Sequence, residues 1–128
     1  MVKRPGRIVA PALVVVVDDD ESVRESLPDL VRELGFDVRA FSSAHEFLGS
    51  GCVAKTRCLL LDVAMPGMSG PDLQRELARS GQQIPIVFIT GHGDDGIRPR
   101  VLQQGAVECL FKPFSETALL AAINTALG

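Results

Sequence analysis

The sequence predicts an α/β fold: a doubly wound, five-stranded parallel sheet with helices on both faces. Two observations lead to this prediction. Five short apolar runs alternate along the chain with segments whose apolar residues recur at helical spacing, as expected of repeated strand–helix units. The apolar runs are also continuous, as in Val14–Val17, which is typical of strands buried on both faces. The chain has 128 residues, enough for one domain with its own core.

Apolar runs and turn residues together set the bounds of the expected elements. Residues 1–11 contain Pro5, Gly6 and Pro11 and are expected to form a flexible N-terminal tail, followed by the domain at residues 12–128. Strands are expected over residues 12–17, 36–41, 58–62, 85–90 and 106–111. Helices are expected over residues 21–34, 43–48, 70–79, 99–104 and 115–127.

Local signals refine this outline. Pro28 lies inside the first helix and is expected to bend it, because proline removes a backbone hydrogen bond. Ser43 and Glu46 have the spacing of a capping box. Pro99 is tolerated only in a first turn, so the fourth helix is expected to begin late. Right-handed crossovers leave few strand orders, of which the flavodoxin-like (βα)5 order is the natural one.

Polar side chains follow four of the five expected strands. Asp18 and Asp19 follow the first strand, Asp62 ends the third, Thr90 ends the fourth and Lys112 follows the fifth. Each residue alone could be an ordinary turn or surface residue. The carboxyl ends of parallel strands meet at one edge of the sheet, and ligands bind in the crevice beyond that edge. The sequence therefore predicts a site built from these five residues.

Phosphoryl transfer to a carboxylate is the chemistry that such a set of residues supports. Asp62 stands apart on its own strand and could act as the nucleophile. Asp18 and Asp19 would help to hold a hard divalent cation, Mg²⁺ or Mn²⁺, which would offset the repulsion among the acids. Thr90 could donate a hydrogen bond to the phosphoryl group, and Lys112 could pair with it as a point charge.

Four motifs of the chain resemble those of the response-regulator receiver domain of two-component signalling. The resemblance covers about residues 12–127, and the wording of the motifs is most similar to receivers with a helix-turn-helix output domain. The motifs are Val17-Asp18-Asp19, Leu61–Gly70, Ile89–Gly93 and Lys112–Phe114.

This resemblance implies a role for each site residue. Asp62 would be the phosphorylation site, with the phosphohistidine of a sensor histidine kinase as donor. Asp19 would ligate Mg²⁺ directly, Asp18 would act mainly through a bound water, and the Ala64 carbonyl would be a further ligand. Thr90 and Lys112 would contact the phosphoryl group. The Lys112–Pro113 peptide bond would be cis, an uncommon state even before proline.

One switch position departs from the family pattern. Receivers couple the residue matching Thr90 to an aromatic residue on the fifth strand, and here that position is Cys109. A thiol is too small to swing between pockets as an aromatic ring does. Gly96 and Pro99 also stand in the usual first half of the fourth helix. A homodimer through the fourth helix, fifth strand and fifth helix is therefore expected to be atypical.

Charge, composition and cysteine content restrict partners and location. The net charge of −3 and the absence of Trp and Tyr argue against a nucleic-acid surface on this segment, although a C-terminal DNA-binding domain could follow in a longer chain. Three cysteines without tight spacing (Cys52, Cys58 and Cys109) favour a reducing, cytoplasmic location.

A signal peptide and a membrane span are not expected. Basic residues precede the apolar stretch that begins at Ile8, as in a signal peptide, but Pro11 interrupts the stretch and acids follow it. No apolar run is long enough to cross a bilayer.

The leading hypothesis is a phosphorylation-switched signalling module that is not an enzyme. It would at most phosphorylate itself from small donors and slowly lose the phosphoryl group. A receiver that acts without phosphorylation, as an interaction module, stays open because of Cys109 and Pro99. A phosphohydrolase of the haloacid-dehalogenase kind would need an acid where Ala64 stands. His92, a lone histidine, is expected to be an exposed loop residue.

Overall fold

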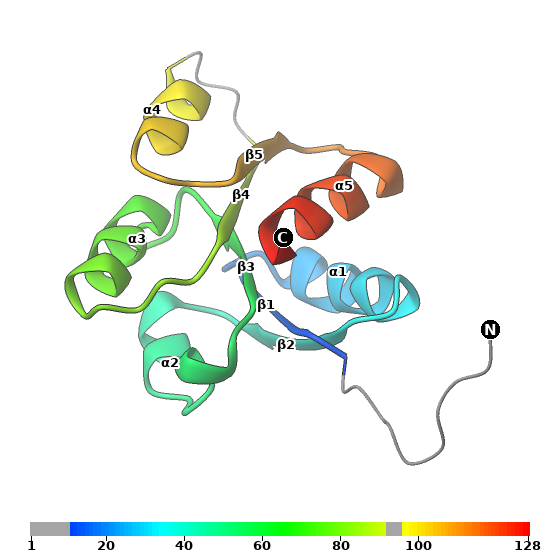
Figure 1. Ribbon diagram of the computed structural model, residues 1–128, viewed down its shortest axis with the longest axis horizontal. Coiled ribbons are helices and arrows are strands. Elements are labelled where there is room, and N and C mark those ends of the chain that lie inside the picture. The colour runs from blue at the N-terminus through cyan, green and yellow to red at the C-terminus, as the bar shows by residue number, and fades with distance from the viewer. Residues whose placement is uncertain (1–10, 92–95) are drawn as a thin grey trace.

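Five parallel strands form one sheet in the order β2-β1-β3-β4-β5 (Figure 1). The computed structural model describes residues 11–91 and 96–128. The strands are β1 (Leu13–Val17), β2 (Asp37–Phe41), β3 (Cys58–Asp62), β4 (Ile86–Thr90) and β5 (Glu108–Phe111). The helices are α1 (Glu21–Glu33), α2 (Ala44–Leu48), α3 (Gly70–Arg79), α4 (Ile97–Gln103) and α5 (Glu116–Leu127). This doubly wound arrangement confirms the predicted fold class.

Helices cover both faces of the sheet, α1 and α5 on one side and α2, α3 and α4 on the other (Figure 1). Alternate residues of each central strand therefore enter different cores. On β1, Val14 and Val16 pack in the core beneath α1 and α5, whereas Val15 and Val17 pack in the opposite core. All four side chains are 0% exposed, which explains why the apolar run is continuous.

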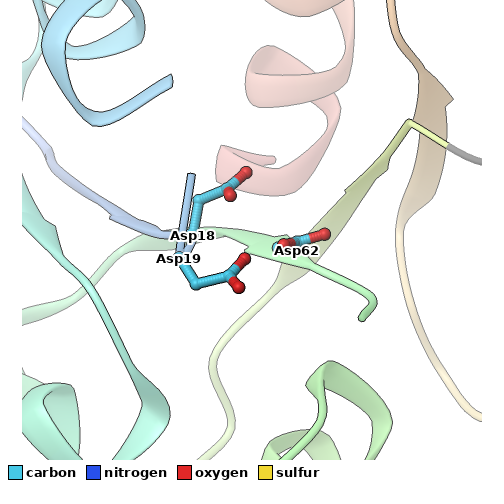
Figure 2. Close-up of side chains that lie close together, drawn as sticks. All are labelled: Asp18, Asp19 and Asp62. Atoms are coloured by element: carbon cyan, nitrogen blue, oxygen red, sulfur yellow. The ribbon is translucent and has the colours of Figure 1, made fainter. Parts of the chain in front are cut away.

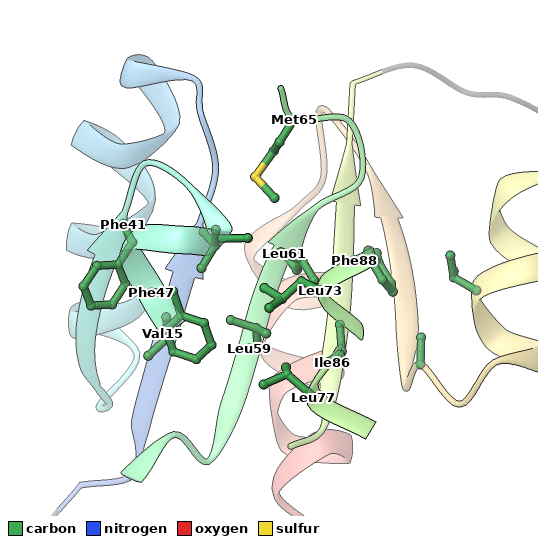
Figure 3. Close-up of a cluster of buried hydrophobic side chains, with 14 of the residues drawn as sticks. Val15, Phe41, Phe47, Leu59, Leu61, Met65, Leu73, Leu77, Ile86 and Phe88 are labelled. Atoms are coloured by element: carbon green, nitrogen blue, oxygen red, sulfur yellow. The ribbon is translucent and has the colours of Figure 1, made fainter. Parts of the chain in front are cut away.

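The core beneath α2, α3 and α4 holds the largest buried rings (Figure 3). Phe47 and Phe88 are 0% exposed, and Leu73 of α3 packs in the same cluster. Cys109 of β5 belongs to this core as well, at 2% exposure. Burial raises the pKa of the Cys109 thiol, so the thiol behaves as a small apolar side chain.

Side-chain caps fix the beginnings of several helices. Asp20 accepts a hydrogen bond from the Ser22 N–H at the start of α1, at 2.9 Å. Ser115 accepts from the Ala118 N–H at the start of α5, at 3.0 Å. None of the helices in the described part of the chain is long and apolar enough to cross a membrane.

The predicted capping box of α2 is only half formed. Ser43 accepts from the Glu46 N–H at 3.0 Å, but the Glu46 carboxylate accepts from the Ser42 N–H at 2.7 Å in place of the Ser43 N–H. A complete capping box occurs at α3, between Ser69 and Asp72.

The prediction for the fifth strand was wrong at its start, which lies at Glu108 and not at residue 106. The Ala106 N–H donates to the Val101 carbonyl at 3.0 Å, so the chain is still leaving α4 at that point. Helix α4 begins at Ile97, two residues before the prediction, and Pro99 lies in its first turn as expected. The segment 49–56, predicted as loop, contains a short 3-10 turn at Val53–Lys55.

Other differences are small or fall outside the described residues. Strands β1, β2 and β4 each begin one residue later than predicted. Helix α1 runs from Glu21 to Glu33 with Pro28 inside it. The predictions for His92 and for the tail at residues 1–10 lie outside the residues that the structure describes.

Gly70 lets α3 begin directly beside the end of β3. Its N–H donates to the Val63 carbonyl at 3.0 Å. A Cβ atom at this position would overlap the Asp62 carbonyl oxygen and would come within 2.9 Å of Phe88 Cε1. Only glycine therefore permits this close approach, which sets how α3 sits against the strand that carries Asp62.

Replacing Gly70 by Ala is expected to lower the free energy of unfolding by about 2 kcal/mol or more, because the backbone oxygen of Asp62 cannot move aside without displacing β3. Urea denaturation followed by far-UV circular dichroism measures the change, since the chain has no Trp or Tyr for fluorescence. Gly49→Ala is the matched control, because its Cβ would lie 3.5 Å from the His45 carbonyl oxygen, an ordinary contact. Equal losses in the two variants would contradict the prediction.

Candidate functional site

Three carboxylates meet at the carboxyl edge of the sheet. Asp18 and Asp19 follow β1, and Asp62 ends β3, the strand that pairs with β1. Each of the three offers an oxygen that lies within 4.8 Å of the other two (Figure 2). Asp18 is 0% exposed and Asp62 is 7% exposed, whereas Asp19 is exposed to solvent. The convergence of these acids confirms the prediction made from the strand ends.

These acids line an open cleft of about 340 Å³. Residues from four of the five strand ends contribute to its wall. The lining residues are Asp18, Asp19, Asp20, Asp62, Ala64, Thr90, Gly91 and Lys112. The cleft thus brings together carboxylates, a hydroxyl group and an ammonium group, as the sequence predicted.

Four hydrogen bonds hold the side chain and backbone of Asp18 in place. Its carboxylate accepts from the Asp20 N–H at 2.9 Å and lies 3.2 Å from Lys112 Nζ. Its backbone N–H donates to the Phe41 carbonyl at 3.2 Å. Its backbone carbonyl accepts from Arg24 Nη1 at 2.9 Å. Asp18 is therefore a fixed part of the cleft wall.

Asp62 has an unusual electrostatic environment. The pKa of its carboxyl group is raised from 3.8 to about 8, first by burial, then by the charge of Asp18 and by hydrogen bonding with Asp19 and Asp18. The ammonium group of Lys112 lowers this pKa but does not offset the other effects. A buried carboxylate beside two others calls for a further cation, and oxygen ligands suit a hard divalent ion. The residues therefore fit a Mg²⁺ site.

The structure also places the remaining predicted residues. Thr90 ends β4 at 4% exposure, and the Lys112 N–H donates to its backbone carbonyl at 2.9 Å. The Lys112–Pro113 peptide bond is cis, as the family resemblance implied. Cys109 does not line the cleft: it pairs in register with Phe88 and is buried in the core.

Arg24 is the site residue that the sequence analysis missed. It lies on α1 and reaches back to the Asp18 carbonyl. A signal was present, because a cation near a helix N-terminus opposes the helix dipole and therefore needs a partner. Asp20 and Gly91 also line the cleft, although their residue types alone do not indicate it.

Comparison with known proteins identifies the family. The sequence model described as response regulator receiver domain matches residues 14–124. The chain belongs to this receiver family. Together with the acidic cluster, this membership makes the domain a phosphorylation-regulated receiver of the two-component type.

Relatives and solved structures agree with this assignment. The chain is 49% identical over 116 residues to the response regulator protein TmoT of Ectopseudomonas mendocina, covering 91% of this chain and 53% of TmoT. It is 51% identical over 115 residues to nodulation protein W of Bradyrhizobium diazoefficiens, covering 90% of this chain and 51% of that protein. The crystal structure of FixJ-N has a TM-score of 0.82 and 37% identity, over 93% of this chain and 95% of that one.

The response regulator StyR is similar at a TM-score of 0.83 and 50% identity, over 92% of this chain and 60% of the StyR chain. The strand order is the flavodoxin-like order of the receiver fold, as predicted. The chain spans about half the length of the curated relatives that it matches, 53% for TmoT and 51% for nodulation protein W.

Replacing Asp62 by Asn is expected to raise the free energy of unfolding of the metal-free receiver near neutral pH, by about 1–3 kcal/mol. The unfolded carboxyl group loses its proton near pH 3.8 and the folded one near pH 8, so the folded state binds the extra proton between these values. Wild-type stability therefore falls as the pH rises through this window, and the advantage of the variant grows.

Denaturation in EDTA at several pH values, followed by circular dichroism, measures this difference. Asp37→Asn makes the same chemical change at an exposed site on β2 and serves as the matched control. A pH profile for Asp62→Asn that runs parallel to that of the wild type would contradict the prediction.

Proposed function

We propose that Asp62 accepts a phosphoryl group from the phosphohistidine of a sensor histidine kinase and that the acyl phosphate switches an output. The observation that carries this proposal is the position of Asp62, at a strand end in an open cleft with two further carboxylates, Thr90 and Lys112. An Asp62 oxygen attacks the phosphorus atom, and the P–N bond of the donor breaks. The electron pair of that bond stays on the imidazole nitrogen, which takes up a proton.

Mg²⁺ or Mn²⁺ would be held by Asp19, Asp62 and the Ala64 carbonyl, with Asp18 acting through a water molecule. The cation supplies charge neutralisation for the phosphoryl oxygens when it is bound. The different surroundings of the two neighbouring acids support this division. The Asp18 carboxylate already has protein partners, whereas the exposed Asp19 faces the cleft.

Lys112 and Thr90 would receive the transferred group. The Lys112 side chain is 27% exposed and lies 3.2 Å from the Asp18 carboxylate, so its ammonium group can pair with a phosphoryl oxygen at the cleft surface. The Thr90 hydroxyl would donate a hydrogen bond to another oxygen. No substrate would be turned over: beyond phosphorylation from small donors, the chemistry would be limited to slow autodephosphorylation.

The output is proposed to lie outside this domain. The chain spans about half of its curated relatives, and two of these are named transcriptional regulatory proteins, FixJ and TdiR. We therefore propose a C-terminal DNA-binding domain in the parent protein and transcription regulation as its role. Three buried cysteines, none of them in a disulfide among the described residues, are consistent with the proposed cytoplasmic location.

Incubation with acetyl phosphate and Mg²⁺ tests the acceptor role by intact-mass spectrometry. Wild-type protein is expected to gain one phosphoryl group, and Asp62→Asn is expected to gain none. No gain in the wild type would favour the interaction module that acts without phosphorylation. Multiple turnover of a phosphate ester would favour a phosphohydrolase.

Substitutions of the neighbouring acids Asp19 and Asp20 are expected to have different effects on phosphorylation. Asp19→Ala is expected to abolish Mg²⁺-dependent phosphorylation, because it removes a proposed cation ligand. Asp20→Ala removes the cap of α1 and should mainly lower the free energy of unfolding, by about 1 kcal/mol. Equal loss of phosphorylation in both variants would contradict this division.

Any homodimer is proposed to differ from the usual α4–β5–α5 type. Arg98 Nη2 lies 2.6 Å from Glu108 Oε1 within the chain, so these two charges already satisfy each other. Helix α4 is short, at 7 residues. Size-exclusion chromatography of the phosphorylated and unphosphorylated forms tests this proposal, with Arg98→Ala as the variant. Dimerisation on phosphorylation that Arg98→Ala weakens would contradict it.

A further inference from the structure

Arg24 makes a contact that the phosphotransfer chemistry does not require. It is half-buried on α1, and its Nη1 atom donates to the Asp18 backbone carbonyl at 2.9 Å. None of the ion pairs among the described residues includes Arg24, although three carboxylates lie in the neighbouring cleft. The guanidinium group is therefore directed at a peptide group and not at an acid.

The peptide group in question joins Asp18 to Asp19. Strand pairing on β1 ends at Val17, so the Asp18 carbonyl has no partner in the sheet. A buried carbonyl without a partner is costly, and without Arg24 this peptide group would lose the hydrogen bond that its oxygen accepts. The carbonyl carbon of Asp18 and the nitrogen of Asp19 both belong to this peptide group, so its orientation contributes to how the two side chains leave the backbone. The hydrogen bond from Arg24 therefore bears on the geometry of both acids.

The location of Arg24 in α1 is otherwise unfavourable. Its backbone N–H donates to the Asp20 carbonyl at 3.1 Å, which places it one turn after the cap. The positive end of the helix dipole opposes a cation there. The contact with the Asp18 carbonyl gives this arginine a role that offsets that cost.

We propose that Arg24 is a positioning residue for the cation site, one that holds the Asp18–Asp19 peptide group in the orientation that Mg²⁺ binding needs. This inference rests on the proposed function, because it concerns the cation used in phosphorylation. A positioning role and a purely electrostatic role of Arg24 predict opposite changes in Mg²⁺ affinity when the side chain is removed. Removing a positive charge near three acids strengthens the binding of a cation, whereas releasing the peptide group weakens it.

Isothermal titration calorimetry with Mg²⁺ on the metal-free protein separates the two effects. Arg24→Met removes the charge and the donor but keeps an apolar stem, and its Mg²⁺ dissociation constant is expected to rise about tenfold or more. Arg24→Lys keeps the positive charge and a hydrogen-bond donor on a side chain of similar length. The Mg²⁺ affinity of this variant should therefore remain much closer to that of the wild type. Arg32→Met is the matched control, because Arg32 lies exposed on the same helix and pairs only with Asp29 among the described residues.

Mg²⁺ affinity in Arg24→Met equal to or tighter than that of the wild type would overturn the inference. An equal rise of the dissociation constant in Arg32→Met would overturn it too, because the effect would then not depend on the contact with the Asp18 carbonyl. If Arg24→Met does not fold, Arg24→Gln carries the same expectation, since its neutral side chain is too short to reach the Asp18 carbonyl. These outcomes leave the Asp62 phosphorylation test intact, so failure of the inference and failure of the proposed function are distinguishable.

Discussion

Repulsion among three carboxylates at the end of a parallel sheet is the constraint on which this structure depends. Asp18 and Asp62 are buried, and their carboxylates lie close to that of Asp19. In a medium of low effective dielectric, such a cluster is unfavourable unless positive charge or proton uptake offsets it. Among the described residues, Lys112 places an ammonium group beside Asp18, and the pKa of Asp62 stays raised despite this charge. The acidic cluster is thus not fully neutralised by the described protein groups, which suits it to bind a hard divalent cation.

Rigid surroundings keep the acids together despite this repulsion. Four valines of β1 fill both cores, and β3 is buried along its whole length, so neither strand can shift to separate the charges. Gly70 brings α3 against the carbonyl of Asp62, and Arg24 ties the turn after β1 to α1. Core packing, which has no charge of its own, therefore holds an arrangement that electrostatics alone would disperse.

The sequence predicted the parts of this arrangement that follow from periodicity. Continuous apolar runs identified the buried strands, and parallel strands necessarily bring Asp18, Asp62, Thr90 and Lys112 to one edge. Contacts between elements were not predictable in the same way. The hydrogen bond from Arg24 to the Asp18 carbonyl depends on the angle between β1 and the helix α1 that follows it. The hydrogen bond from Gln74 to the Gln104 carbonyl, at 3.1 Å, joins residues 30 positions apart in the sequence. The start of β5 was misjudged because hydrogen bonds at the end of α4 hold Ala106, and apolar character alone does not reveal them.

The position of Cys109 restricts how a change in the cleft can reach the α4–β5–α5 face. Its register opposite Phe88 and its 2% exposure place the thiol within a packed core, and the thiol is too small to move between pockets as an aromatic ring does. The cleft is nevertheless connected to this face through the backbone, because the Lys112 N–H donates to the Thr90 carbonyl across β4 and β5. Glu108 at the start of β5 is in turn bonded to Arg98 of α4. The backbone of β5 and the ion pair between Arg98 and Glu108 therefore link the edge of the cleft to α4 without an aromatic residue at position 109.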